Sequence, residues 1–366
     1  MKNELIYQIA LTLVPHIGAV HAKILVQHFG NAGAVFRAKK SALEKIEGIG
    51  EIRARSLISF NHFSAAEDEL LFIEKYKIQP LFLTDKNYPK RLLNCYDPPV
   101  LLFYKGNTDL NVSKIVAIIG TRGNSDYGKQ VTEKLVKDLA VSGVLVVSGL
   151  AFGIDAIAHR AALKNDLSTV AVLAHGLNKI YPPEHLSLAK EMVSQGGLLT
   201  EFGSKTKPDK HNFPTRNRIV AGMCDATIVV ETSLKGGSMI TAELANGYNK
   251  DVFALPGKIT DSRSAGCNYL IKNNKAVLLT DANELIELMG WAEKIKQKPR
   301  KQKELFIELT GNEKIILTIL QQKESVHIDE INLKSNLTSS AVAAAILNME
   351  LQNLVASLPG KMYCLM

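Results

Sequence analysis

Residues 114–130 read KIVAIIGTRGNSDYGKQ, an apolar run followed by a glycine-rich loop and the start of an amphipathic segment. Six more short apolar runs follow between residues 144 and 281, and amphipathic stretches such as 127–142 and 182–195 separate most of them. Short continuous apolar runs that alternate with helices are typical of a parallel sheet covered on both faces. The sequence predicts an α/β fold with a doubly wound, mostly parallel sheet, in which ligands bind beyond the carboxyl ends of the strands.

The loop in this stretch is one residue short of an ATP-binding P-loop. Gly123, Gly128 and Lys129 follow the spacing of that motif, which ends in Lys followed by Ser or Thr, but the next residue here is Gln130. Glutamine cannot supply the hydroxyl that binds magnesium. Two alternatives remain from the pattern: an ATPase without its magnesium ligand, or a loop that holds another kind of phosphate.

The segment before this stretch belongs to the same predicted domain. Residues 76–113 are rich in aromatic residues and proline, and the run VLLFY (100–104) reads as a short buried strand. We therefore expect one domain over residues 76–290.

The first region, residues 1–75, predicts paired helices separated by short glycine turns. The stretch 43–57 carries the turn GIG (48–50) and resembles a helix-hairpin-helix, whose turn points backbone N–H groups at a DNA phosphate. Arg53 and Arg55 would add charge contacts. A helical pair that serves packing alone is the alternative.

The last part of the chain predicts a linker and a small domain. Residues 291–304 carry six Lys or Arg against two Glu and read as a charged, exposed linker. Residues 305–366 predict three helices, the third capped by a threonine or serine (338–339), and then a β-wing, so they resemble a winged-helix domain. Winged helices usually bind DNA through the third helix. Here that helix offers Asn348 and Gln352 and no Lys or Arg, so a protein-interaction role is an equal alternative.

The composition narrows the class of protein. The formal net charge of +8 favours a polyanionic partner, while the hydrophobic content of 46% and charged content of 22% are those of an ordinary globular protein. The four cysteines are scattered without a C-x-x-C pair, which argues against zinc and disulfides and suits a reducing cytoplasm. No apolar run approaches the ~18 residues of a membrane span, and the first residues lack a signal-peptide pattern. We expect a cytoplasmic protein with no membrane partner.

Four loops of the predicted domain should meet at one edge of the sheet, because each of them follows a strand. They are 120–128, 148–163, 211–222 and 231–244. Each is expected to offer backbone N–H groups at a helix N-terminus, where the helix dipole favours anions. Together they bring Arg122, Arg216, Arg218 and Lys235 to this edge, and Arg is suited to bidentate binding of phosphate. The sequence therefore predicts an anion site.

No catalytic set accompanies this predicted site. Ser148 lacks the Gly-x-Ser-x-Gly frame of a hydrolase elbow, and the dinucleotide fingerprint Gly-x-Gly-x-x-Gly is missing. His159 and His175 have no cysteine or carboxylate at metal-ligand spacing and are expected on a helix surface or in a loop. We predict no catalytic residue, no metal and no cofactor.

The order of the motifs resembles the DprA/Smf family of bacterial DNA-processing proteins. The matching pieces, across about residues 88–272, are YPKRL, DPPVLLFYKG, VAIIGTRGNSDYG, VVSGLAFGIDAIAHRAAL, AVLAHGLNKIYPPEH, LLTEF, NFPTRNRIVAG, GGSMITAELA, VFALPG and GCNYLI. The resemblance implies an extended Rossmann-like domain that binds single-stranded DNA, usually as a homodimer. It also implies a protein that protects incoming DNA during natural transformation and helps to load the recombinase RecA onto it.

The DNA pocket that the resemblance implies coincides with the predicted anion site. The DNA-binding candidates are Gly120, Thr121, Arg122, Ser148, Gly149, Gly153, Arg216, Asn217, Arg218, Lys235, Gly236, Gly237 and Ser238. Where some members have a basic residue after YP, this chain has Pro183, and Lys179 is the nearby cation that would replace it. Single strands also stack on aromatic side chains. The aromatic candidates, for which core packing is the alternative, are Tyr127, Phe152, Tyr181 and Phe213.

A different class of function would use the same anion site. Related Rossmann-like families hydrolyse nucleotides or phosphoribosyl compounds with a GGxGT-type turn and a nearby Glu. Here the turn is GGSMIT, with Glu231 before it and Glu243 after it. A scaffold whose end modules bind proteins is a third alternative.

Overall fold

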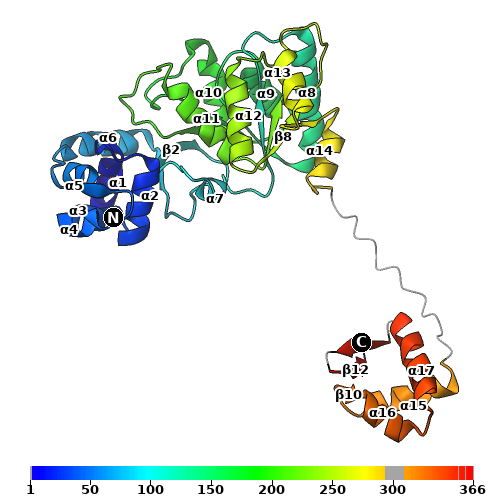
Figure 1. Cartoon of the computed structure of the whole chain (residues 1–366). Helices are drawn as coiled ribbons and strands as arrows, with labels where there is room; N and C mark the ends of the chain where they lie inside the picture. Colours follow the sequence, from blue (N-terminus) through cyan, green and yellow to red (C-terminus); the bar gives the residue numbers. More distant parts are fainter. Residues whose placement is uncertain (1, 293–308, 353, 359, 366) are drawn as a thin grey trace. The chain divides into compact units, whose positions relative to one another are not determined.

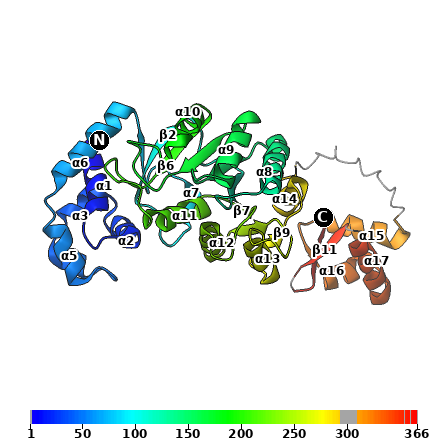
Figure 2. The same cartoon turned by 90° about the horizontal axis from the view of Figure 1, so that it is seen from above.

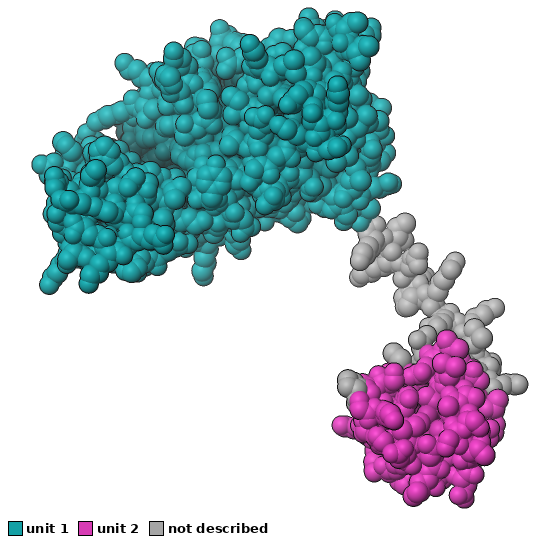
Figure 3. Space-filling model, viewed as in Figure 1, with its two compact units in different colours: residues 1–292 teal, residues 293–366 magenta. Residues whose placement is uncertain are grey.

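The residues described by the computed structural model are 2–292, 309–352, 354–358 and 360–365. The chain divides into two compact units, Met1–Ala292 and Glu293–Met366 (Figure 3). Most of the linker predicted at 291–304 lies outside the described residues, and the domain boundary predicted near residue 75 stays a prediction. Within the described part of the chain, no helix has both the length and the apolar character that a bilayer crossing needs.

The predicted parallel sheet lies in the first unit (Figure 1). Among the described residues it has nine strands in the order β1-β2-β6-β5-β4-β3-β7-β8-β9. The seven apolar runs form the seven neighbouring parallel strands, as predicted. The VLLFY run supplies most of β2, which pairs antiparallel with β6 and with β1, so both of these strands belong to the same sheet. The strands are β1 (Gln79–Phe82), β2 (Leu101–Gly106), β3 (Ile115–Ile119), β4 (Leu145–Ser148), β5 (Thr169–Val172), β6 (Gly196–Thr200), β7 (Ala226–Val229), β8 (Asp251–Ala254) and β9 (Val277–Leu278).

Helices cover both faces of the sheet because its central strand is apolar on both sides (Figure 2). Val116 and Ile118 of β3 pack in one core with α8, α9 and α14. Ala117 and Ile119 point the other way, into a core shared with α11, α12 and the N-terminal helices, as the two-residue period of a strand requires. The helices of this region are α7 (Lys90–Leu93), α8 (Asp126–Leu139), α9 (Ile154–Lys164), α10 (Leu186–Gln195), α11 (Asn212–Gly222), α12 (Gly237–Gly247), α13 (Ala265–Lys272) and α14 (Ala282–Leu288).

The connections place one crevice at the centre of the sheet. β4 pairs with one side of β3 and β7 with the other, and both pairs are parallel. From β3 the strands follow outward to β6 on one side, and the chain then crosses to β7 and continues to β9 on the other. The loops that follow β3, β4 and β7 therefore leave from the same edge, at the topological switch point where α/β sheets bind ligands.

The N-terminal helices pack directly against this sheet domain. A single apolar core runs from α1 through α6 to β3. Glu69 of α6 is 9% exposed and accepts hydrogen bonds from the backbone N–H of Ser204 at 2.9 Å and from its hydroxyl at 2.7 Å. The predicted hairpin turn joins α4 to α5, and Gly48 there has φ 82°, in the left-handed region that favours glycine. The helices are α1 (Lys2–Leu13), α2 (Ala19–Phe29), α3 (Ala32–Arg37), α4 (Lys40–Glu44), α5 (Gly50–Ile58) and α6 (Phe63–Tyr76).

The second unit contains the predicted winged-helix domain. Thr338 caps the third helix by accepting a hydrogen bond from the N–H of Ala341 at 3.3 Å, and Val342, Ile346 and Met349 of that helix are buried in the core. Its elements are α15 (Gly311–Leu320), β10 (Val326–His327), α16 (Ile328–Ser335), α17 (Ser339–Leu351), β11 (Val355–Leu358) and β12 (Met362–Leu365), and the strands pair in the order β10-β12-β11. The outer face of α17 exposes Leu347 and Leu351.

Candidate nucleic-acid interface

A cavity opens at the switch point, between the loops that follow β3, β4 and β7 and the helices α11 and α12. Its empty space, including the open mouth, is ≈ 910 Å³. Nine of the thirteen predicted residues line it: Gly120, Thr121, Arg122, Gly149, Arg216, Asn217, Gly236, Gly237 and Ser238. The structure therefore brings these nine residues together around one cavity, and their role in binding DNA stays a prediction.

Three residues with hydroxyl side chains that are absent from the predicted site also line the cavity, namely Thr232, Ser233 and Thr241. Ser238 donates a hydrogen bond to the Thr232 hydroxyl at 2.7 Å, which fixes part of this wall. Thr232 and Ser233 lie in the loop that follows β7, so their place after an apolar run was the signal that could have identified them.

Glu231 fixes the shape of the first loop. Its carboxylate accepts hydrogen bonds from the backbone N–H of Ser125 at 2.9 Å and from the Ser125 hydroxyl. Its backbone carbonyl accepts a hydrogen bond from the N–H of Thr121 at 2.7 Å. Ser125 in turn caps α8 by accepting a hydrogen bond from the N–H of Gly128 at 3.0 Å. The 120–128 loop is therefore held between two strand ends before any ligand arrives.

Arg216 lies at the back of the cavity with very little exposure. Its side chain is 6% exposed, its Nη1 donates to the carbonyl of Val172, and its buried Nε has no hydrogen-bond partner. A Cβ on Gly149 would overlap the Arg216 guanidinium and lie 2.5 Å from Asp155 Oδ2, so only glycine lets both side chains reach this place. Burial raises the pKa of Asp155, and the charge of Arg216 counteracts that rise. Arg216 and Asp155 therefore lie together, both buried, at the wall of the cavity.

Three further predicted residues do not line the cavity. Ser148 is fully buried and donates its hydroxyl to the carbonyl of Ile118 at 2.6 Å, so it serves the sheet. Gly153 has φ 78° and lies at the N-cap of α9, against the backbone of the first loop. Lys235 is exposed on the turn before α12, next to glycines that do line the cavity.

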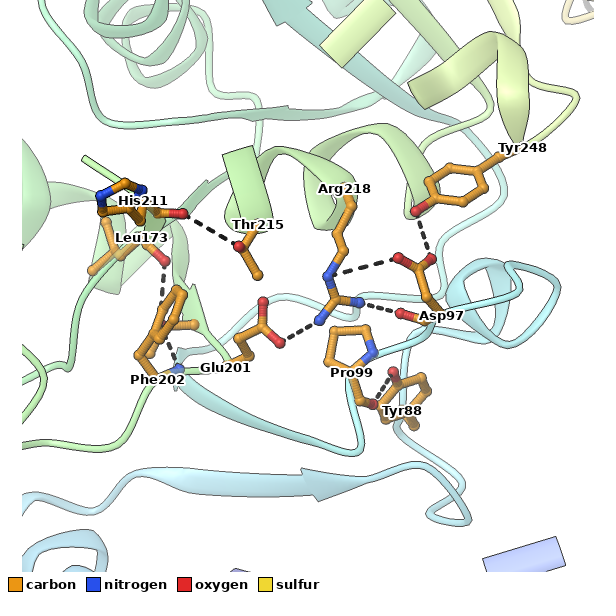
Figure 4. Close-up of polar contacts among 11 residues, drawn as sticks. Tyr88, Asp97, Pro99, Leu173, Glu201, Phe202, His211, Thr215, Arg218 and Tyr248 are labelled. Carbon is orange, nitrogen blue, oxygen red and sulfur yellow. Dashed lines mark hydrogen bonds and ion pairs between the residues drawn. The ribbon is translucent and has the colours of Figure 1, made fainter. Parts of the chain in front are cut away.

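Arg218 has a different role from the predicted one (Figure 4). It forms an ion pair with Glu201, donates to the carbonyl of Asp97, and has its Nε 4.0 Å from Asp97 Oδ2. Tyr248 donates its hydroxyl to Asp97 Oδ1 at 2.6 Å. Arg218 thus ties α11 to β6 and to the 94–100 segment.

The reason is the position of the helix. The sequence predicts both arginines at the opening of a helix, but α11 begins at Asn212, so their backbone N–H groups lie inside it. Residues two apart in an α-helix point about 200° away from each other, since each step turns about 100°. Only Arg216 can face the cavity, and the prediction for Arg218 is corrected accordingly.

A second, narrower cleft adjoins the cavity and has aromatic walls. Phe152, Tyr181 and Phe213 line it together with Arg122 and Arg216. The Arg122 guanidinium lies 5.4 Å from the centre of the Phe213 ring, a cation–π distance. Of the four aromatic candidates, these three rings therefore face the site. The fourth, Tyr127, lines neither the cavity nor the cleft.

The two glutamates of the hydrolase alternative are engaged elsewhere. The carboxylate of Glu231 accepts hydrogen bonds from the backbone N–H and the hydroxyl of Ser125. Glu243 is half exposed and lies 3.6 Å from the Nζ of Lys275, and it does not line the cavity. Among the described residues, no group of three or more His, Cys, Asp or Glu could hold a metal ion.

His159 was expected on a helix surface or in a loop, but it is fully buried. Its Nε2 lies 2.6 Å from the carbonyl of Gly149, and its Nδ1 lies 2.6 Å from the hydroxyl of Thr169. Because a carbonyl only accepts, Nε2 carries the proton, and burial lowers the pKa of the ring to about 4. The neutral ring therefore supports the loop that carries Gly149.

We expect acid to destabilise the chain through His159. The unfolded ring, with an ordinary pKa near 6.5, takes up a proton before the folded ring does, so stability is lost as the pH falls from about 6.5 towards 4. Between pH 7 and pH 5 this histidine should lower the free energy of unfolding by about 2 kcal/mol. Urea titrations at both pH values measure it. An equal loss in a His159→Gln variant would assign the effect to other groups.

Three family models match this chain and together span most of its length. The model of DNA recombination-mediator protein A matches residues 79–290, the DprA winged helix domain matches residues 299–361, and the helix-hairpin-helix motif matches residues 8–69. Protein Smf of Synechocystis sp. is 33% identical over 403 residues, which cover 99% of each chain. DNA processing protein DprA of Streptococcus pneumoniae is 37% identical over 272 residues, which cover 69% of this chain and 96% of its own.

Solved structures agree with these sequence matches. The X-ray structure of DNA processing protein A from Streptococcus pneumoniae matches with a TM-score of 0.67 and 33% identity, over 78% of this chain and 98% of that one. DNA processing protein A from Helicobacter pylori, solved for its single-stranded DNA binding mode, matches with a TM-score of 0.53 and 34% identity, over 58% of this chain and 97% of that one. The chain therefore belongs to the DprA/Smf family of DNA recombination mediators.

Proposed function

We propose that this chain binds single-stranded DNA at the switch-point cavity, protects it and helps to load RecA onto it. The observation that carries the proposal is that two arginines, Arg122 and the buried Arg216, line the cavity beside an aromatic cleft. Arg side chains and glycine backbone suit the phosphates of the strand, and exposed rings suit its unpaired bases. Paired bases inside a duplex cannot reach such rings. The Helicobacter pylori relative, whose structure concerns single-stranded DNA binding, supports the same assignment.

The test is a fluorescence titration with single-stranded DNA, duplex DNA of the same sequence and ATP, each at two salt concentrations. With about three phosphates neutralised, the slope of log K against log salt should be roughly −2, because single strands give about −0.7 per phosphate contact. The affinity for the single strand should fall about 20-fold between 50 and 200 mM salt. Equal affinity for the duplex, or a slope near zero, would contradict the proposal.

RecA and a second copy of the chain are the proposed protein partners. The family description as a recombination mediator supports the step to RecA. The far edge of the sheet supports the homodimer, because the edge strand β9 exposes Val277 and Leu278, and Tyr269 of the neighbouring α13 is 39% exposed. Short apolar edges of this kind are commonly covered by a partner. We place the protein in the cytoplasm, where both partners and reduced cysteines occur together.

We propose that the chain acts by binding and not as an enzyme. Glu231 is engaged with the loop backbone, and Glu243 points to Lys275, so neither described carboxylate of the hydrolase alternative stands free at the cavity. The ATP arm of the titration examines this point. Turnover of ATP or of a phosphoribosyl compound that a Glu243→Gln change abolishes, without measurable binding of single strands, would favour the hydrolase.

A further inference from the structure

Helix α17 of the second unit is apolar on two opposite faces. One face, with Val342, Ile346 and Met349, is buried in the core of the winged-helix domain. On the other face Leu347 is 56% exposed and Leu351 is 75% exposed. A helix that is apolar all round is normally covered on all sides, because apolar surface gains free energy when it leaves water. Within the described part of the chain, this outer face is left open to solvent.

The exposed side chains of α17 follow a regular spacing. Ser340, Ala344, Leu347 and Leu351 are all exposed, and the steps between them are four, three and four residues. At about 100° per residue, these positions fall within about 60° of one another, on the side opposite the buried face. Alternating steps of four and three residues are the spacing of a seam that packs against a second helix. We name these four residues the outer row of α17.

The outer row carries no charge, and this restricts the kind of partner it can bind. The third helix of a winged-helix domain usually binds DNA, but α17 has no Lys or Arg to meet the phosphates. Glu350 is the one charged residue of this helix, and its negative charge repels a DNA backbone. An uncharged apolar row fits another uncharged apolar surface instead.

The order of small and large side chains makes the outer row complementary to itself. The small residues Ser340 and Ala344 come first, and the two leucines follow toward the end of the helix. When two copies pack antiparallel, Leu351 of one copy meets Ser340 of the other, and Leu347 meets Ala344. Each layer then holds one large and one small side chain, which fills the space between two helices. A parallel pair would set leucine against leucine and leave a gap between the small residues.

We propose that α17 is a self-association surface, on which the outer row of one chain packs antiparallel against the outer row of a second copy. The contact uses the same residues on both chains, so a two-fold axis relates them. One helix face per chain is a small interface, and the association is therefore weak and depends on concentration. This contact is separate from the β9 edge, and it does not depend on the binding of DNA.

The test is disulfide trapping between full-length chains that each carry one new cysteine. An Ala344→Cys chain is mixed with a differently tagged Leu347→Cys chain, and mild oxidation is followed on a non-reducing gel. We expect this mixed dimer to form about tenfold faster than the one between Ala344→Cys and Ser339→Cys, because only facing positions meet the short Cβ distance of a disulfide. Ser339 is the matched control, since it is exposed but points about 100° away from Ser340. Wild-type chains report any trapping through the partly exposed Cys364.

A charge placed in the outer row should break the contact. A mixture of Ser340→Cys and Leu351→Cys chains should also be trapped, and adding Leu347→Glu to both chains should slow that trapping about tenfold, because the contact would bury two like charges. Ser339→Glu in both chains is the matched control, and it should leave the rate within about twofold. All of these positions are exposed, so the variants are expected to keep the fold of the domain.

The outcomes that contradict the proposal are distinct. Equal trapping rates for facing pairs and for the Ser339 pair overturn the self-association, and so does trapping that Leu347→Glu leaves unchanged. Faster trapping of Leu347→Cys with itself than with Ala344→Cys overturns the antiparallel packing. A different partner for the outer row, including the first unit of the same chain, would give no trapped dimer and would also overturn the proposal.

Discussion

We expect an Arg122→Ala variant to bind a short oligothymidylate about 10- to 100-fold more weakly than the wild type. Arg122 is exposed, lines both the cavity and the aromatic cleft, and lies over the Phe213 ring. A hydrogen bond to a charged group contributes about 1.5–3 kcal/mol, which corresponds to this range of affinity. Polarisation titrations at low and moderate salt measure the loss, and its salt slope should become shallower by about 0.7.

The matched control for Arg122 is Arg160→Ala. Arg160 is exposed on α9 and lines neither the cavity nor the aromatic cleft, yet its loss changes the net charge equally. We expect its affinity to stay within about twofold of wild type, because salt screens an exposed charge that does not touch the bound strand. If both variants lose affinity equally, the binding reflects overall charge and the cavity is not the site.

An Arg218→Ala variant should lose about 3–5 kcal/mol of unfolding free energy, because it leaves the carboxylate of Glu201 buried without its partner. Burial already raises the pKa of Glu201 in the wild type, and the charge of Arg218 opposes that rise. Without Arg218 the pKa rises further, so the folded carboxyl takes up a proton before the unfolded one does. The variant should regain stability as the pH falls towards 4.5, in contrast to the trend that His159 imposes.

Urea titrations of Arg218→Ala and of the double variant Arg218→Ala/Glu201→Gln, together with DNA titrations, distinguish a loss of stability from a loss of DNA affinity. The double variant removes the buried charge and should recover part of the lost stability. Once folded, it should bind single strands with nearly wild-type affinity, because Arg218 lies outside the cavity. A stable Arg218→Ala variant with weakened DNA binding would restore the role that the sequence suggested for Arg218.

The sheet could be predicted because its strands are short apolar runs in a regular order. Each parallel strand must be apolar on both faces, and β3 reads as five consecutive apolar residues for that reason. The meeting of the loops after β3, β4 and β7 follows from the parallel direction alone. Arg122 lies in the loop that follows β3 and was therefore predictable as a residue of the site.

The remaining parts of the site depend on where helices begin and on which side chains are buried, and the sequence pattern predicts neither. A shift of a few residues in the start of α11 decides which arginine faces the cavity, and Pro214 in its first turn gave no sharp boundary. The buried states of His159 and His175 depend on how the surrounding elements pack, so both histidines looked ordinary in the sequence. The role of a buried polar residue cannot be predicted from the sequence until the packing around it is known.

The hydrogen bond between Glu69 and Ser204 and the core that α1–α6 share with β3 fix the N-terminal helices to the sheet domain. The hairpin turn at Gly48 cannot swing as a separate arm, since its helices are packed onto the same body as the cavity. A DNA strand that contacted both the hairpin turn and the cavity would have to span a constant distance, which the packing of the protein sets. The same number of nucleotides would then lie between the two contacts in every complex.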